Sequence, residues 1–93
     1  MPRYLVERTF PDRPALPGPD QDAQARLTFI GNNALDGVTW VHSYVAPDRK
    51  KSFCICDAPT PEAVRRAAQR NGLPIDRITE VRVLDPYFYH PIC

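Results

Sequence analysis

Long hydrophobic runs are missing from this sequence of 93 residues: none approaches the ~20 residues that a membrane-spanning helix requires. We expect neither a membrane span nor a signal peptide, because the first residues run straight into a strand pattern. The sequence also lacks a large net charge, because its twelve basic residues nearly balance its eleven acidic residues. Nucleic acid, which selects a dense positive field, is therefore not expected as a partner.

Signatures of common catalytic and nucleotide-binding sites are absent as well. The sequence has no Gly-x-Ser-x-Gly elbow, no phosphate-binding loop and no Gly-x-Gly-x-x-Gly fingerprint. A thiol beside an imidazole is the nearest approach to a nucleophile, and no oxyanion site is evident next to it. The sequence therefore favours a binding protein over an enzyme.

Cysteine is scarce, and its spacing argues against disulfides. Cys54 and Cys56 are separated by one residue on an expected strand, which places their side chains too far apart for an unstrained bridge. The third cysteine, Cys93, leaves an odd total. Free thiols are typical of a reducing compartment, so we expect a cytoplasmic protein.

Two helices and four strands are expected. Alternation and β-branched residues predict strands over four segments: 3–10, 38–45, 52–57 and 78–84. The first helix has apolar residues at helical spacing: Ala23, Leu27, Ile30 and Ala34. Asp20 or Asp22 is expected to cap its start and Gly37 to end it. Thr60 is expected to cap the second helix, which Gly72 ends.

The resulting order βαββαβ predicts an α+β fold of the ferredoxin-like type. Such a chain most simply builds a four-stranded antiparallel sheet with both helices on one face. In that topology the third strand lies between the first and the second. We expect one domain over residues 1–89 and a C-terminal tail over residues 90–93.

Alternation along the expected strands sorts their residues into two sets. The first is nearly all apolar and should face the helices as the core: Tyr4, Val6, Val41, Val45, Phe53, Ile55, Thr79, Val81 and Val83. The second combines apolar and chemically functional groups: Leu5, Glu7, Thr9, Trp40, His42, Tyr44, Cys54, Cys56, Ile78, Glu80, Arg82 and Leu84. Monomers seldom expose such an apolar face. We therefore expect two copies to pack these faces together as a dimeric α/β barrel.

The second set predicts a metal site. His42 and the thiols of Cys54 and Cys56 belong to adjacent strands, and Glu7 or Glu80 would add a carboxylate. Thiolate and imidazole favour zinc, nickel, copper or cobalt. Each residue also has an ordinary interpretation. The cysteines serve as buried fillers, the histidine as a hydrogen-bonded interior residue, and each glutamate as one half of an ion pair.

Several segments carry a resemblance to a known family: VERTF (6–10), GVTWVHSY (37–44), FC (53–54), DAPTPEA (57–63), NGLP (71–74) and ITEV (78–81). On these residues the chain resembles a family of small bacterial proteins of unassigned function, some of which are described as nickel-binding. The likeness extends over about residues 3–89. It implies a dimeric ferredoxin-like barrel with nickel or a similar ion as its ligand.

The resemblance also implies candidate ligands at the positions that match: Glu7, His42, Tyr44, Cys54 and Glu80. The chain departs from the family pattern at Cys56, where an aromatic residue is expected, and in the tail that ends in Cys93. An additional sulfur shifts metal preference toward softer ions or serves only as packing.

Three functions follow from these observations. The leading hypothesis is a small cytoplasmic, non-catalytic homodimer that binds nickel or another divalent transition metal. The second is a small dimeric barrel enzyme that holds an aromatic or quinone-like substrate between sheet and helices. The third is an interaction module that serves a larger partner. The sequence leaves open the metal, any substrate or reaction, and the pathway.

Overall fold

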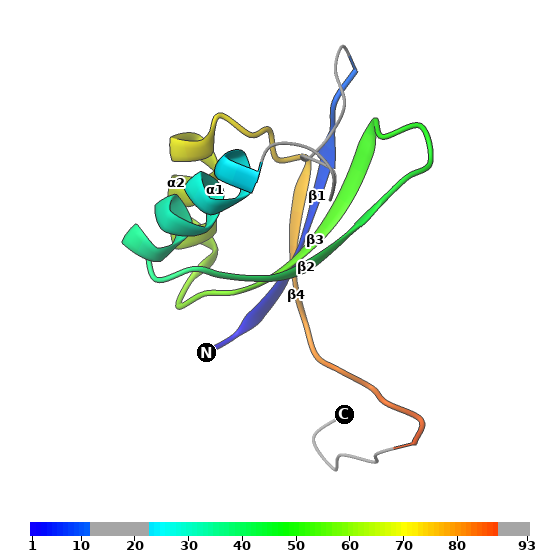
Figure 1. The fold of residues 1–93 in the computed structure, drawn as a ribbon. Helices are drawn as coiled ribbons and strands as arrows, with labels where there is room; N and C mark the ends of the chain where they lie inside the picture. The colour runs from blue at the N-terminus through cyan, green and yellow to red at the C-terminus, as the bar shows by residue number, and fades with distance from the viewer. Residues whose placement is uncertain (12–22, 88–93) are drawn as a thin grey trace.

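The computed structural model describes residues 1–11 and 23–87. Its elements follow in chain order: β1 (Arg3–Thr9), α1 (Ala23–Leu35), β2 (Thr39–Val45), β3 (Lys51–Asp57), α2 (Pro61–Asn71) and β4 (Arg77–Val81). The strands form one antiparallel sheet in the order β2-β3-β1-β4. Both helices lie on one face of this sheet (Figure 1). The predicted ferredoxin-like α+β fold is therefore confirmed.

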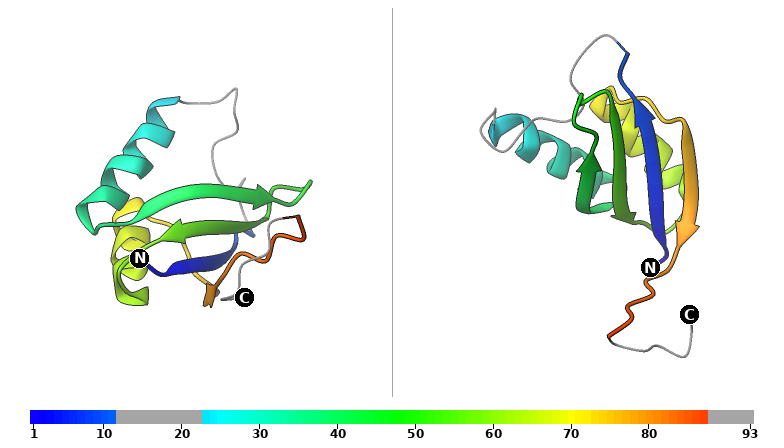
Figure 2. Two further views of the ribbon diagram at one scale, coloured as in Figure 1. Left: turned by 90° about the horizontal axis from the view of Figure 1, so that it is seen from below. Right: turned by 90° about the vertical axis from the view of Figure 1, so that its right-hand side faces the viewer.

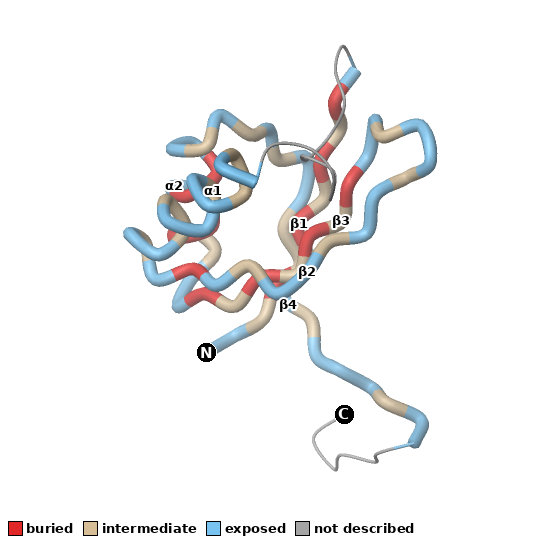
Figure 3. The backbone as a smooth tube through the Cα atoms, viewed as in Figure 1, coloured by how far each residue is buried: buried red, intermediate tan, exposed pale blue. Residues whose placement is uncertain are grey.

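The centre of the molecule is the pairing of β1 with β3. Burial alternates strictly along both strands, and every buried position of one strand lies opposite a buried position of the other. The buried residues collect between the sheet and the helices, as Figure 3 shows in red. We call this side of the sheet the helix side, and the opposite side the open face.

Helix α2 is the main cover of the helix side, and both of its ends match the sequence prediction. The Thr60 hydroxyl accepts a hydrogen bond from the amide of Ala63 at 3.1 Å. Gly72 ends the helix in the left-handed conformation, with φ of 67°, which costs a glycine little. The buried stripe consists of small residues: Ala63, Val64, Ala67 and Ala68. A stripe this narrow leaves room beneath the helix.

Helix α1 forms where it was predicted, but its apolar positions do not face the core. Leu27 and Ile30 are 60% and 50% exposed, and no described residue of the helix is buried. Phe29 instead packs partly against the core. The predicted caps Asp20 and Asp22 lie outside the described residues.

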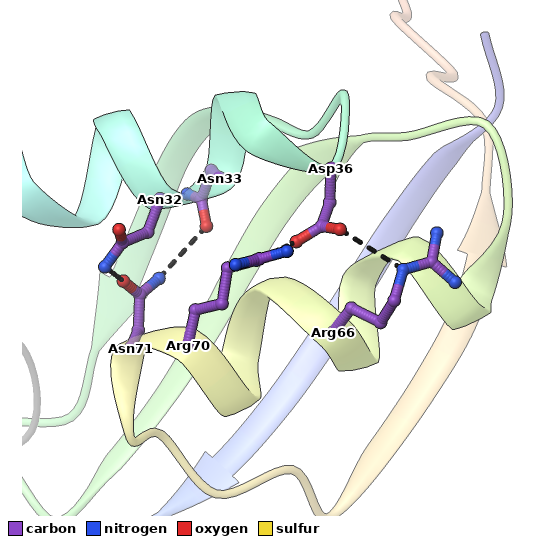
Figure 4. A network of polar contacts seen from close by, with 6 residues as sticks. All are labelled: Asn32, Asn33, Asp36, Arg66, Arg70 and Asn71. Carbon is purple, nitrogen blue, oxygen red and sulfur yellow. Dashed lines mark hydrogen bonds and ion pairs between the residues drawn. The ribbon is translucent and has the colours of Figure 1, made fainter.

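Polar contacts hold α1 against α2 (Figure 4). Asp36, which follows α1, accepts hydrogen bonds from Arg70 at 2.9 Å and from Arg66 at 3.2 Å. The hydrogen bonds from Arg70 and then Arg66 lower the pKa of the Asp36 carboxyl. Asn71 of α2 exchanges amide hydrogen bonds with two consecutive asparagines of α1 at 2.8 and 3.1 Å. Polar side chains therefore link the two helices at several points.

The remaining expectations about the chain concern its loops and ends. Strand β4 ends at Val81, earlier than the alternation to Leu84 predicts. Neither helix in the described part of the chain has the length and apolar character needed to span a bilayer. The tail residues His90 and Cys93 lie outside the described residues.

The cap of α2 gives a first prediction. Replacing Thr60 by Ala removes the acceptor for the Ala63 amide. The free energy of unfolding should fall by about 1 kcal/mol, with an unchanged slope in urea titrations. Thr60→Ser keeps the acceptor oxygen and should retain most of the stability. Equal losses in both variants would show that the cap does not stabilise the helix.

Candidate functional site

Both strand thiols belong to the core. Cys54 and Cys56 are 2% and 5% exposed, and both are free cysteines. In the observed register Cys54 lies opposite Val6 and Cys56 lies opposite Tyr4. Directly opposed residues share a face, so both sulfurs point to the helix side. The expectation that these cysteines share a face with Glu7 was wrong.

The large apolar residues of β3 take the other side. Phe53 lies opposite Glu7, and Ile55 lies opposite Leu5. All four are partly exposed on the open face. The sequence predicted Phe53 and Ile55 in the core because they are larger and more apolar than cysteine. The register reverses that assignment, because only one alternate set of β3 can lie beneath the helices.

A β-bulge decides where His42 lies. The register of β2 shifts between Trp40 and His42, so Val41 is an extra residue that reverses the alternation. Trp40 stays on the helix side, and its indole donates a hydrogen bond to the hydroxyl of Ser43 at 2.8 Å. Trp40 and Ser43 are three positions apart in the sequence. Residues at this spacing lie on opposite faces of a regular strand, and these two share a face because of the bulge. His42 therefore lies on the open face, opposite Ile55.

The open face thus carries its own set of functional side chains. Two neighbouring rows run across β1, β3 and β2, formed by Glu7, Phe53 and Tyr44 and by Leu5, Ile55 and His42. The His42 and Tyr44 rings meet edge to face with centroids 5.2 Å apart. Tyr44 is 64% exposed. An imidazole, a phenol and a carboxylate therefore border an apolar centre.

Glu80 lies away from these residues. It is opposite Tyr4 in the register of β4 with β1, and so belongs to the helix side. Burial raises the pKa of the Tyr4 hydroxyl, and the charges of Glu80 and Glu62 raise it further. Glu80 itself is exposed at the rim of the sheet.

The six predicted ligands are therefore divided between two faces. Three lie on the open face, namely Glu7, His42 and Tyr44, and three on the helix side, namely Cys54, Cys56 and Glu80. Within residues 1–11 and 23–87, no three His, Cys, Asp or Glu side chains form a group that could hold a metal ion. The predicted convergence of imidazole and thiols within one protomer was wrong.

The surroundings of the Cys56 thiol disfavour its thiolate form. Burial raises its pKa to about 11, with the nearby Cys54 thiol raising it further and the positive charge of Arg8 opposing the shift. Metal ligation and nucleophilic attack both require the thiolate. Cys56 therefore serves chiefly as a compact core residue.

Arg8 lies on the helix side, although it was not predicted there. It continues the phase of Tyr4 and Val6 along β1 and is 6% exposed. Its Nε has no hydrogen-bond partner among the described residues. The alternation that placed Tyr4 and Val6 in the core also placed Arg8 there, so the signal was present in the sequence. Arg8 lines a cavity beneath the helices together with both thiols.

The raised pKa of Cys56 predicts a pH dependence of stability. Above its ordinary pKa of 9.0 the unfolded thiol ionises, whereas the folded thiol holds its proton up to about 11. The folded state then binds more protons, so the free energy of unfolding falls as the pH rises through this window. The loss should reach about 2 to 3 kcal/mol.

Urea titrations between pH 8 and 11 measure this loss. Cys56→Ala should show a smaller decline than the unmodified chain, because tyrosines and lysines titrate alike in both proteins. Parallel declines in the two proteins would contradict the burial of this thiol.

Comparison with known proteins adds to this geometry. A family model described as "Nickel responsive protein SCO4226-like" matches residues 4–81. The fold is similar to the crystal structure of SCO4226 from Streptomyces coelicolor A3(2), with a TM-score of 0.69 and 22% sequence identity. That alignment covers 89% of this chain and 99% of the other. No curated protein matches at a significant level. Because the family match spans most of the sequence, the chain belongs to the SCO4226-like family.

Proposed function

We propose that this protein is a homodimer that binds nickel or a similar divalent transition metal at its open face. The observation that carries the proposal is the exposed imidazole of His42 on a sheet face that also presents Glu7. The description of the family as nickel responsive supports the choice of metal. The proposed role is binding rather than catalysis. The proposed location is the reducing cytoplasm, which suits a protein with free thiols.

The composition of the open face supports a dimer. Leu5, Phe53 and Ile55 form its centre, while both helices cover the opposite side (Figure 2). A contiguous apolar surface on a small protein commonly marks an interface. Packing two such faces together removes these side chains from water. We therefore propose the same dimeric α/β barrel that the sequence predicts. Its interface is now formed by Phe53 and Ile55 in place of Cys54 and Cys56.

The metal ligands are proposed to come from both copies. Within residues 1–11 and 23–87, one protomer offers a single imidazole, from His42, and on the same face a carboxylate from Glu7 in the neighbouring row of the sheet. These are too few for a four- to six-coordinate ion, and a second copy doubles the set. Nitrogen and oxygen donors suit nickel, zinc or copper. Tyr44 orients the imidazole through its edge-to-face contact.

The thiols are not part of this proposal. Cys54 and Cys56 are buried on the helix side, and neither reaches the open face. Glu80 is also on the helix side. The proposed donor set is therefore harder than one with sulfur, which favours nickel or zinc over monovalent copper.

Nickel binding by the reduced protein tests the proposal. Equilibrium dialysis with metal analysis should find stoichiometric nickel in the unmodified chain. His42→Ala should weaken binding by at least about tenfold, since loss of even a supporting residue costs this much. His90→Ala is the matched control, because the sequence contains just these two histidines. It should bind as the unmodified chain does.

The carboxylates offer a second matched pair. Glu7→Gln should weaken nickel binding, whereas Glu80→Gln, on the helix side, should not. Absence of stoichiometric nickel, or equal losses in both members of either pair, would contradict the proposal.

Subunit number is measured on the same samples by native mass spectrometry. The unmodified chain should be a dimer. Ile55→Glu places a charge at the centre of the open face and should give a folded monomer that no longer binds nickel. A monomer that retains stoichiometric nickel would show that the second copy is not needed.

A further inference from the structure

The chain beyond β4 leaves the body of the molecule. Residues 82–87, which we call the arm, extend past the end of the sheet and away from both helices (Figures 1 and 2). The large apolar side chains of the arm are exposed: Val83 by 54%, Leu84 by 71% and Tyr87 by 88%. Apolar side chains concentrated in this way on the surface of a small protein mark a site of interaction.

A groove lies at the base of the arm. Its volume is about 510 Å³, within the range of roughly 300–1,000 Å³ that binding clefts occupy. Arg3 lies opposite both Asp57 and Val81 in the sheet, and all three line the groove. These residues alternate in phase with Leu5 and Ile55, so the groove opens on the open face. The other lining residues come from the N-terminus, the end of β4 and the base of the arm: Met1, Pro2, Glu80, Arg82 and Val83.

The lining of the groove favours a neutral, largely apolar occupant. Its two arginines balance its two carboxylates, so the groove has no excess charge to attract an ion. Arg3 and Asp57 already form an ion pair, in which the guanidinium donates hydrogen bonds at 2.7 and 3.1 Å. The rest of the lining suits aliphatic or aromatic side chains, since it consists of Met1, Pro2, Val81 and Val83.

A second copy of the chain supplies such an occupant. The chain's own arm does not fill the groove, because Arg82 and Val83 form its wall and the rest of the arm leads away from it. The groove opens on the open face, and is therefore continuous with the surface on which the second copy is proposed to pack. In a two-fold dimer the same surfaces meet in both directions, so each arm can serve the groove of the other copy.

We propose that the two copies exchange arms, so that the arm of each packs into the groove of the other. This inference rests on the dimer of the proposed function and names the segment that holds it together. Leu84 and Tyr87 are the side chains that enter the groove. A tyrosine has an apolar ring and a polar tip, which match the apolar walls and the ion pair of Arg3 and Asp57. Exchange of an identical segment is a low-cost route to a dimer.

A matched pair of leucine substitutions tests the exchange. Sedimentation of the full chain at a series of concentrations measures the dissociation constant of the dimer. Leu84→Asp should raise this constant by at least about tenfold, as expected for a large side chain lost from a buried interface site. Leu27→Asp is the control, because Leu27 is also an exposed leucine but lies on α1. It should leave the constant unchanged.

Disulfide trapping locates the arm. Two variants of the full chain, both with Cys93→Ser, are mixed and allowed to exchange subunits. One variant carries Leu84→Cys and the other carries Pro2→Cys. Cys54 and Cys56 are buried and should not react. Mild oxidation should link the two variants into one covalent species, whose mass identifies both chains. Placing the second cysteine on α1 instead, as Thr28→Cys, should abolish the link.

Failure of the inference is distinguishable from failure of the proposed function. Equal dissociation constants for Leu84→Asp and Leu27→Asp, or absence of the mixed cross-link, would overturn the exchange and leave the proposed dimer in place. A disulfide within one chain that carries both Leu84→Cys and Pro2→Cys would show that the arm folds back on its own groove, and would overturn it too. A monomeric unmodified chain would contradict both proposals. Because the arm supplies no proposed ligand, Leu84→Asp at concentrations that keep it dimeric should still bind stoichiometric nickel.

Discussion

The pairing of β1 with β3 is the constraint on which the rest of the structure depends. It places Val6 opposite Cys54 and Tyr4 opposite Cys56, and strand alternation then fixes the face of every other residue on these strands. The helices cover the side on which these four residues lie. Sliding β3 by one residue would bring Phe53 and Ile55 under α2, where the stripe of Ala63, Val64, Ala67 and Ala68 now packs.

The bulge at Val41 adds a second, local constraint. A regular β2 would have carried His42 to the helix side beside Cys54. The sequence predicted that these two residues share a face, but it placed that face on the side away from the helices. The extra residue turns the imidazole to the open face and leaves Trp40 in contact with the core. One inserted residue therefore separates the imidazole of His42 from the two thiols.

The sequence predicted the fold well because its signals are local. The cap at Thr60, the left-handed glycine at position 72 and alternation within each strand need no knowledge of other segments. The phase of one strand relative to another is not local. Cys54 and Phe53 compete for the core, and hydrophobicity favours Phe53, whereas the register favours Cys54. The same limit applies to α1, whose apolar residue Leu27 remains exposed because polar contacts orient that helix.

Residue-resolved alkylation of thiols in the Ile55→Glu variant tests the central claim, which is that thiols and imidazole lie on opposite faces. Breaking the proposed dimer exposes the open face and leaves the helix side covered. The account predicts that Cys54 and Cys56 stay protected from iodoacetamide until the chain unfolds, while His42 reacts readily with diethyl pyrocarbonate. Rapid alkylation of either cysteine in the folded variant, at a rate near that of unfolded protein, would contradict it.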